Sequence, residues 1–135
     1  MKLEQQVCSF ELAKRLKELG VKQESFFVWS GHTEPATLWR HDAWAERDIY
    51  PLKKGLYYAA LTIAELGEML PMSVGHSDTG EEWLFCTKVG DGYSVGYGEI
   101  GDRGIDFMHM EEASTEADAR AKMLIYLLEN NLITI

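Results

Sequence analysis

With 135 residues, 46% of them hydrophobic and 26% charged, the chain has the composition of one globular domain that extends over residues 1–135. No apolar run approaches the ~20 residues needed to cross a bilayer, and the N-terminus lacks a leader pattern, so we expect a cytoplasmic protein without membrane partners. The net charge of −9 is concentrated in residues 65–118, which carry thirteen acidic and two basic residues. That segment repels nucleic-acid backbones, and direct binding of DNA or RNA is therefore not expected.

The first predicted element is an amphipathic helix over residues 9–19, with Ser9 as its N-cap. Gly20 and Val21 form its stop signal, because a glycine accepts the left-handed conformation and an apolar residue then folds back on the last turn. Residues 25–30 are aromatic and β-branched, which predicts a strand.

Residues 31–53 show no clean period, and we expect an irregular segment there in which residues 36–48 could hold a short helix. A second strand is predicted over residues 55–60. Thr62 and Glu65 then form a capping box that opens a short helix. Pro71 ends this helix, and residues 72–81 are predicted to be a polar loop.

A β-meander is predicted next, with strands over residues 82–89, 93–100 and 105–110 and glycine-rich turns between them. A turn formed by residues 90–92 would place Val89 opposite Tyr93 and Phe85 opposite Tyr97. Two glycines of the middle strand, Gly96 and Gly98, indicate that a bulky group such as Phe107 or a helix lies across them.

The last predicted element is a helix over residues 114–130, whose apolar arc is wide enough for a core position. Leu124 and Leu128 are predicted at the centre of the core. Ser114 or Thr115 can cap this helix.

Two polar interactions are expected along the same helix. Asp118 and Lys122 have the spacing of an i,i+4 ion pair. Arg120 lies within the apolar arc, and we expect it to pair with Glu112 or Glu116.

The element order and the hairpin turns together predict an α+β fold. We expect one antiparallel sheet of about five strands, including the C-terminal β-meander, with two long helices and one short helix on one face. Cys8 and Cys86 are expected to be reduced structural cysteines.

The densest polar and aromatic cluster predicts a binding segment. It consists of Trp39, Arg40, His41, Asp42 and Trp44. Tryptophan and arginine dominate binding hot spots because they bury large areas and keep a polar group. In the alternative interpretation, both tryptophans anchor a long loop on the core and the charged groups are solvated.

A second hypothesis is a small-molecule- or metal-binding protein, or a hydrolase, that uses the cluster between His32 and Asp48. Its candidate ligands are His32, Glu34, His41, Asp42, Glu46 and Asp48. Their spacing matches no known ligand pattern, and no resident metal or cofactor is predicted. A hydrolytic pair of His76 and Asp78 beside Glu81 is a weaker alternative. Nucleotide-binding and nucleophile motifs are lacking, which favours a non-enzymatic function.

Three blocks of the chain resemble a group of small uncharacterised proteins encoded in bacteriophages and prophages. The blocks are ELAKRLKELGVKQES, TIAELGEMLP and EADARAKMLIYLLENNLI, in the family's order. The resemblance implies expression in the cytoplasm of a bacterial host and carries no catalytic residues. By analogy with small accessory phage proteins, it implies a module that binds a host or phage protein, and it leaves self-association open.

Overall fold

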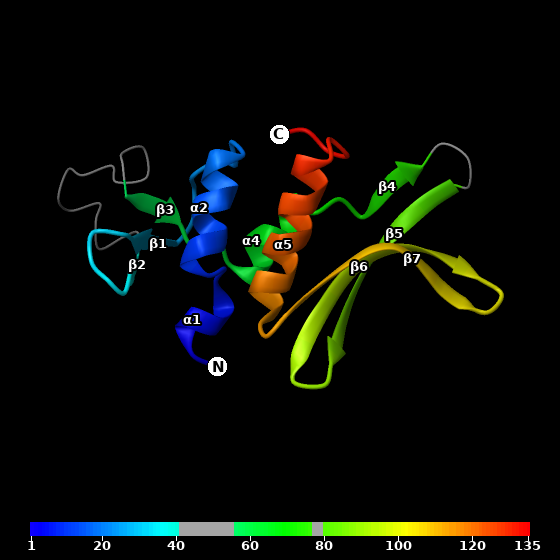
Figure 1. Ribbon diagram of the computed structural model, residues 1–135, viewed down its shortest axis with the longest axis horizontal. Helices are drawn as coiled ribbons and strands as arrows, with labels where there is room; N and C mark the ends of the chain where they lie inside the picture. The colour runs from blue at the N-terminus through cyan, green and yellow to red at the C-terminus, as the bar shows by residue number, and fades with distance from the viewer. Residues whose placement is uncertain (41–55, 77–79) are drawn as a thin grey trace.

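The computed structural model describes residues 1–40, 56–76 and 80–135, in which helices lie between two β-sheets (Figure 1). The helices are α1 (Leu3–Gln6), α2 (Phe10–Glu18), α4 (Ile63–Met69) and α5 (Glu116–Glu129). The first sheet has the order β2-β1-β3, built from β1 (Phe27–Ser30), β2 (Thr37–Arg40) and β3 (Tyr57–Ala59). The second has the order β4-β5-β6-β7, built from β4 (Ser73–His76), β5 (Gly80–Val89), β6 (Gly92–Gly101) and β7 (Gly104–Ala113).

The α+β class and the antiparallel pairing are confirmed, but the prediction of one sheet with about five strands is wrong. The structure has two sheets, one on each side of the helices, because the chain leaves β3, passes through α4 and reaches the far side before β4 begins. Two short strands were missed. β2 lies in the segment predicted to be irregular and β4 in the predicted polar loop, and strands of four residues are too short to show a period.

The predicted helix over residues 36–48 is wrong at its beginning, where β2 occupies Thr37–Arg40 and pairs with β1. The remainder of that prediction lies outside the described residues. The first sheet packs on α2 through edge-to-face aromatic contacts. The centroid of the Phe10 ring lies 6.3 Å from that of the Trp29 ring and 5.5 Å from that of the Tyr58 ring.

The stop signal of α2 is confirmed. Gly20 has a φ of +88°, and the N–H of buried Val21 donates to the carbonyl of Leu16 at 3.0 Å. Ser9 occupies the N-cap position, but its side chain makes no capping bond. Instead, its backbone N–H donates to the Asp118 carboxylate at 2.7 Å, which ties the start of α2 to α5.

The capping box of α4 is also confirmed. The Thr62 hydroxyl accepts from the N–H of Glu65 at 3.1 Å, and the Glu65 carboxylate accepts from the N–H of Thr62 at 2.7 Å. The same carboxylate accepts from the hydroxyl of Ser25 at 2.8 Å, so it also holds the segment that leads into β1.

The buried residues of α5 form the centre of the core: Ala117, Ala119, Ala121, Met123, Leu124 and Leu127. The position of Leu124 is confirmed. That of Leu128 is wrong, since this side chain is only partly buried and Leu127 takes the core position. The N-cap is Thr115, whose hydroxyl accepts from the N–H of Asp118 at 3.2 Å.

The polar interactions of α5 differ in part from the expected ones. Arg120 binds Glu116 at 2.8 and 3.1 Å, as predicted. The expected pair of Asp118 and Lys122 is wrong, because the Asp118 carboxylate accepts from the start of α2 and the Lys122 ammonium donates to the carbonyl of Glu112 at 2.9 Å.

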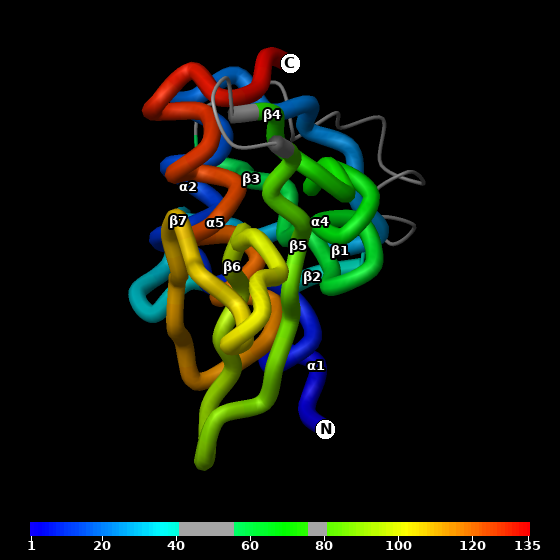
Figure 2. Tube along the Cα trace, turned by 90° about the vertical axis from the view of Figure 1, so that its right-hand side faces the viewer, coloured from blue at the N-terminus to red at the C-terminus, as the bar shows by residue number. Residues whose placement is uncertain are grey.

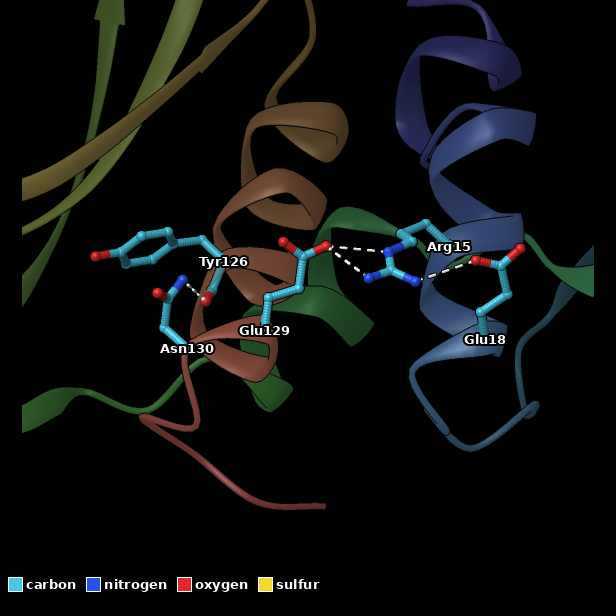
Figure 3. A network of polar contacts seen from close by, with 5 residues as sticks. All are labelled: Arg15, Glu18, Tyr126, Glu129 and Asn130. Atoms are coloured by element: carbon cyan, nitrogen blue, oxygen red, sulfur yellow. Dashed lines mark hydrogen bonds and ion pairs between the residues drawn. The ribbon is translucent and has the colours of Figure 1, made fainter.

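A surface network also joins α2 to α5 (Figure 3). Arg15 donates to Glu129 at 3.0 Å and to Glu18 at 3.2 Å. All three side chains are exposed, so solvent screens these pairs and they contribute little to stability. The α2–α5 contact is therefore held by apolar packing and by the part-buried hydrogen bond from the Ser9 N–H to the Asp118 carboxylate.

Candidate functional site

The register of β5 and β6 decides which side chains share a face of the second sheet. The turn contains two residues, Gly90 and Asp91, and Val89 pairs with Gly92. The predicted three-residue turn is therefore wrong, and so is the pairing of Phe85 with Tyr97. Gly90 has a φ of +58°, which suits the tight two-residue turns that match the twist of a hairpin. A slip of one residue exchanges the two faces of one strand.

The inner face of the sheet packs on α5. Val95 and Tyr97 of β6 are fully buried there, beside their partners Cys86 and Leu84 on β5. The Tyr97 hydroxyl donates to the carbonyl of Pro71 at 2.6 Å, and burial raises the pKa of this phenol. This face belongs to the core at Val95 and Tyr97, whereas Cys86 is exposed.

The outer face is organised around the two glycines of β6. A Cβ atom on Gly96 would lie 3.0 Å from the Phe107 ring and 2.9 Å from the Met110 side chain, and one on Gly98 would lie 3.1 Å from the same ring. The predicted position of Phe107 across the glycines is thus confirmed. The Phe85 ring meets the Phe107 ring edge-on at 5.8 Å. The glycines allow large side chains of the flanking strands to meet above β6.

We call this surface the aromatic face. It consists of Trp83 and Phe85 from β5, Ile100 from β6, and Ile105, Phe107 and Met110 from β7. Ile100 is 69% exposed and Trp83 41% exposed. The helices lie on the opposite side of this sheet (Figure 1). Several large apolar side chains therefore face solvent together, which is uncommon on a monomeric soluble domain.

Acidic residues flank the aromatic face. Glu81 lies two residues before Trp83 on β5, and Glu112 lies two residues after Met110 on β7, so alternation places both on the outer face. Both side chains are exposed. The outer face thus has an apolar centre with exposed carboxylates beside it.

The predicted binding segment is only partly described. Trp39 and Arg40 lie on β2, at the edge of the first sheet, and not in a loop. Trp39 is 46% exposed, and its indole N–H donates to the hydroxyl of Thr37 at 2.8 Å. His41, Asp42 and Trp44 lie outside the described residues. The binding role of this segment stays a prediction.

The predicted metal or hydrolase cluster is also mostly outside the described residues, which include only His32 and Glu34 of its six members. The His32 ring packs on the Tyr57 ring at 4.8 Å. Within residues 1–40, 56–76 and 80–135, no group of three His, Cys, Asp or Glu side chains is placed to bind a metal ion. The metal hypothesis stays a prediction, as does the pair of His76 and Asp78.

His109 has a structural environment. Its ring stacks on that of Tyr126 at 3.5 Å, and its Nε2 atom lies 2.9 Å from the Glu111 carboxylate. These contacts join β7 to α5 and leave the ring in a packed position.

Comparisons with protein-family models, with curated proteins and with solved structures found no match. The resemblance to phage-encoded proteins therefore stays a prediction. In the part of the chain that the structure describes, no helix has the length and apolarity required to span a membrane.

The two cysteines are both free thiols, but their environments differ. Cys8 is fully buried, and this burial raises its pKa to about 12. Cys86 is exposed on β5, and desolvation of part of its side chain raises its pKa as well. A nucleophilic cysteine requires the opposite shift, so neither thiol has the properties of a catalytic group.

We expect one thiol per chain to react with Ellman's reagent at pH 8 in the native protein. It is Cys86, and it should react more slowly than an unhindered thiol because its raised pKa leaves less thiolate. Cys8 should react only after guanidinium unfolds the chain. A Cys86→Ser variant serves as the control and should show no reactive thiol before unfolding. Two fast thiols in the native protein would contradict the burial of Cys8.

Proposed function

We propose that this protein is a non-enzymatic interaction module that binds a partner protein through the aromatic face. The observation that carries this proposal is the large apolar surface, from Trp83 to Met110, on the side of the second sheet that faces away from the helices. Tryptophan and phenylalanine supply most of the energy of such contacts when a partner excludes water from them.

Charge favours a particular kind of partner. Residues 65–118, which include the whole second sheet, carry a net charge of −11. Two copies placed face to face would bring Glu81 and Glu112 of each copy near those of the other. A partner with an apolar centre and a basic rim avoids this repulsion and associates faster. The resemblance to prophage-encoded proteins supports a host or phage protein in the bacterial cytoplasm as that partner.

Part of the aromatic face also has a structural role, since Phe85 and Phe107 pack on each other over the glycines. That packing covers part of each ring, although Phe107 is still 38% exposed. It does not cover Ile100 or Trp83, whose exposed area remains available to a partner.

Substitutions on the aromatic face should weaken partner binding without unfolding the protein. A photoreactive amino acid at Ile100 captures the partner from a bacterial lysate, and the identified protein is then purified and titrated against each variant by calorimetry. We expect Trp83→Ala to cost about 2 kcal/mol of binding free energy, or roughly thirtyfold in Kd, as at other hot spots. Ile100→Ser should have a smaller effect in the same direction.

The matched control is Phe26→Ser, because Phe26 is 74% exposed but lies just before β1, in the other sheet. It should bind the partner as the natural chain does. Affinity should also fall as salt is raised, since salt screens the acidic rim. Equal binding by Trp83→Ala and Phe26→Ser would refute the assignment, as would capture of only further copies of this chain.

A further inference from the structure

The pairing of β5 with β6 on one side and with β4 on the other fixes the direction of its backbone N–H and C=O groups. Val89 and Gly92 close a two-residue turn, and such closing pairs are hydrogen-bonded, so odd-numbered residues of β5 direct their N–H and C=O groups toward β6. Even-numbered residues direct theirs to the other side. The N–H of Leu84, which donates to the carbonyl of Met72 at 2.9 Å, confirms this direction.

β4 covers only part of that side of β5. Ser73–His76 pairs with Gly80–Trp83, and the last contact is the bond to Leu84. In the described part of the chain, no strand pairs with the remainder of β5 on this side. Cys86 and Lys88 therefore present their backbone donors and acceptors at an open edge, which is a template for another strand.

The open edge borders two adjoining recesses with volumes of about 240 and 110 Å³. Figure 2 shows α1 beyond the lower half of β5, and the lining comes from α1, the β5–β6 hairpin and the start of α5. Lys88, Asp91, Tyr93, Ser114 and Glu116 contribute to this lining. The larger recess is thus mainly polar, with charges of both signs, whereas the smaller one has polar and apolar lining in similar measure.

We propose that this edge accepts an extended segment of a partner protein, which joins the second sheet as a further strand antiparallel to β5. Such strand addition obtains its affinity from main-chain hydrogen bonds and its specificity from alternate side chains. The inference rests on the proposed protein-binding function, and it uses different residues from the aromatic face, so the two are tested separately.

The alternation of the sheet predicts the composition of the segment. Side chains opposite Cys86 and Lys88 would enter the recesses, where an uncharged side chain with both a hydroxyl and a methyl group, such as threonine, fits the mixed polar and apolar lining. Side chains between them would lie on the outer face beside Phe85 and Val89, where apolar groups fit. Acidic residues are excluded by the net charge of −11 in residues 65–118.

A second copy of this chain is a less suitable occupant. Each chain carries a net charge of −9, so two copies repel each other. A different protein with an uncharged or basic segment lacks this repulsion.

The probe is an acetylated and amidated peptide with the sequence Lys-Thr-Val-Thr-Val-Thr-Lys. In the predicted pairing its threonine N–H groups point toward β5 and its valine N–H groups point away. N-methylation of the threonines should therefore weaken binding by at least roughly tenfold, whereas N-methylation of the valines should leave it nearly unchanged. NMR titration of the labelled protein should show the largest amide shifts at Cys86 and Lys88.

A pair of protein variants tests the same edge. Lys88→Pro removes the outward N–H at a position where proline is tolerated, because that group makes no bond to β6. It should lose peptide binding, while Lys88→Ala, which keeps the N–H, should retain it.

Equal binding by the two N-methylated peptides would mean non-specific adsorption and would overturn the inference, as would no binding at all. Self-association of the natural chain that Lys88→Pro abolishes would instead identify a second copy as the occupant. If the peptide does not bind but Trp83→Ala still weakens binding of the captured partner, the inference about the edge fails and the proposed function stands.

Discussion

Replacing Leu124 with alanine is expected to lower the free energy of unfolding by about 2–5 kcal/mol, the usual cost of removing a fully buried leucine side chain and leaving a cavity. Leu124 is completely buried in the middle of α5, which packs on α2, α4 and both β6 and β7. Since a domain of this size has about 5–15 kcal/mol of stability in total, the melting temperature should fall by on the order of 10 °C.

Leu128→Ala is the matched control for this prediction, because it deletes the same atoms from the same helix at a side chain that is only partly buried. Its cost should be clearly smaller than that of Leu124→Ala, since less apolar area leaves water and no enclosed cavity forms. Urea unfolding monitored by circular dichroism measures both variants. Equal losses would show that the core extends along α5 to its last turn.

Most helices and strands could be predicted from the sequence because their signals are local. The capping box of Thr62 and Glu65 and the stop signal at Gly20 use bonds between residues three to five apart, so the pattern contains the interaction. The division into two sheets could not be predicted, because nothing local indicates that α4 carries the chain across the helix layer between β3 and β4.

A contact between residues far apart in the sequence explains why the ion pair predicted on α5 is wrong. The spacing of Asp118 and Lys122 predicts an ion pair, but the carboxylate binds the backbone of Ser9, which is more than a hundred residues earlier in the chain. A bond of a carboxylate to an otherwise unpartnered N–H at a helix start is stronger than an exposed i,i+4 pair. The sequence holds no signal for this choice.

The candidate site shows how sensitive a surface prediction is to register. The glycines of the middle strand predicted a bulky neighbour, with Phe107 or a helix as the candidates. The identity of the face was not, because a turn of three residues instead of two places Phe85 with Tyr97 in the core rather than above Gly96. The aromatic face thus emerges only once the positive φ of Gly90 fixes the turn.

The glycines of β6 lead to the second large prediction: Gly98→Val should destabilise the protein by about 1–3 kcal/mol or more, through overpacking. A Cβ at this position would lie 2.8 Å from the backbone carbonyl oxygen of Asp106 and 2.8 Å from the Ile105 side chain. A backbone oxygen cannot rotate away, so β7 would have to move off β6 near the bulge between Tyr97 and Gly98. The same movement would displace Phe107, and partner binding should fall along with stability.

Gly75→Val is the matched control, because Gly75 also lies in a strand of the second sheet but a Cβ there would meet nothing within 4 Å. Valine favours extended backbone, and glycine in a strand loses more conformational freedom on folding, so this variant should be neutral or gain a few tenths of a kcal/mol. The same substitution is therefore expected to destabilise the protein at Gly98 but not at Gly75. Chemical unfolding of both measures the difference. If Gly98→Val were as stable as Gly75→Val, β7 would not approach β6 closely enough to bring Phe107 over the glycines, and the aromatic face would lose its geometric basis.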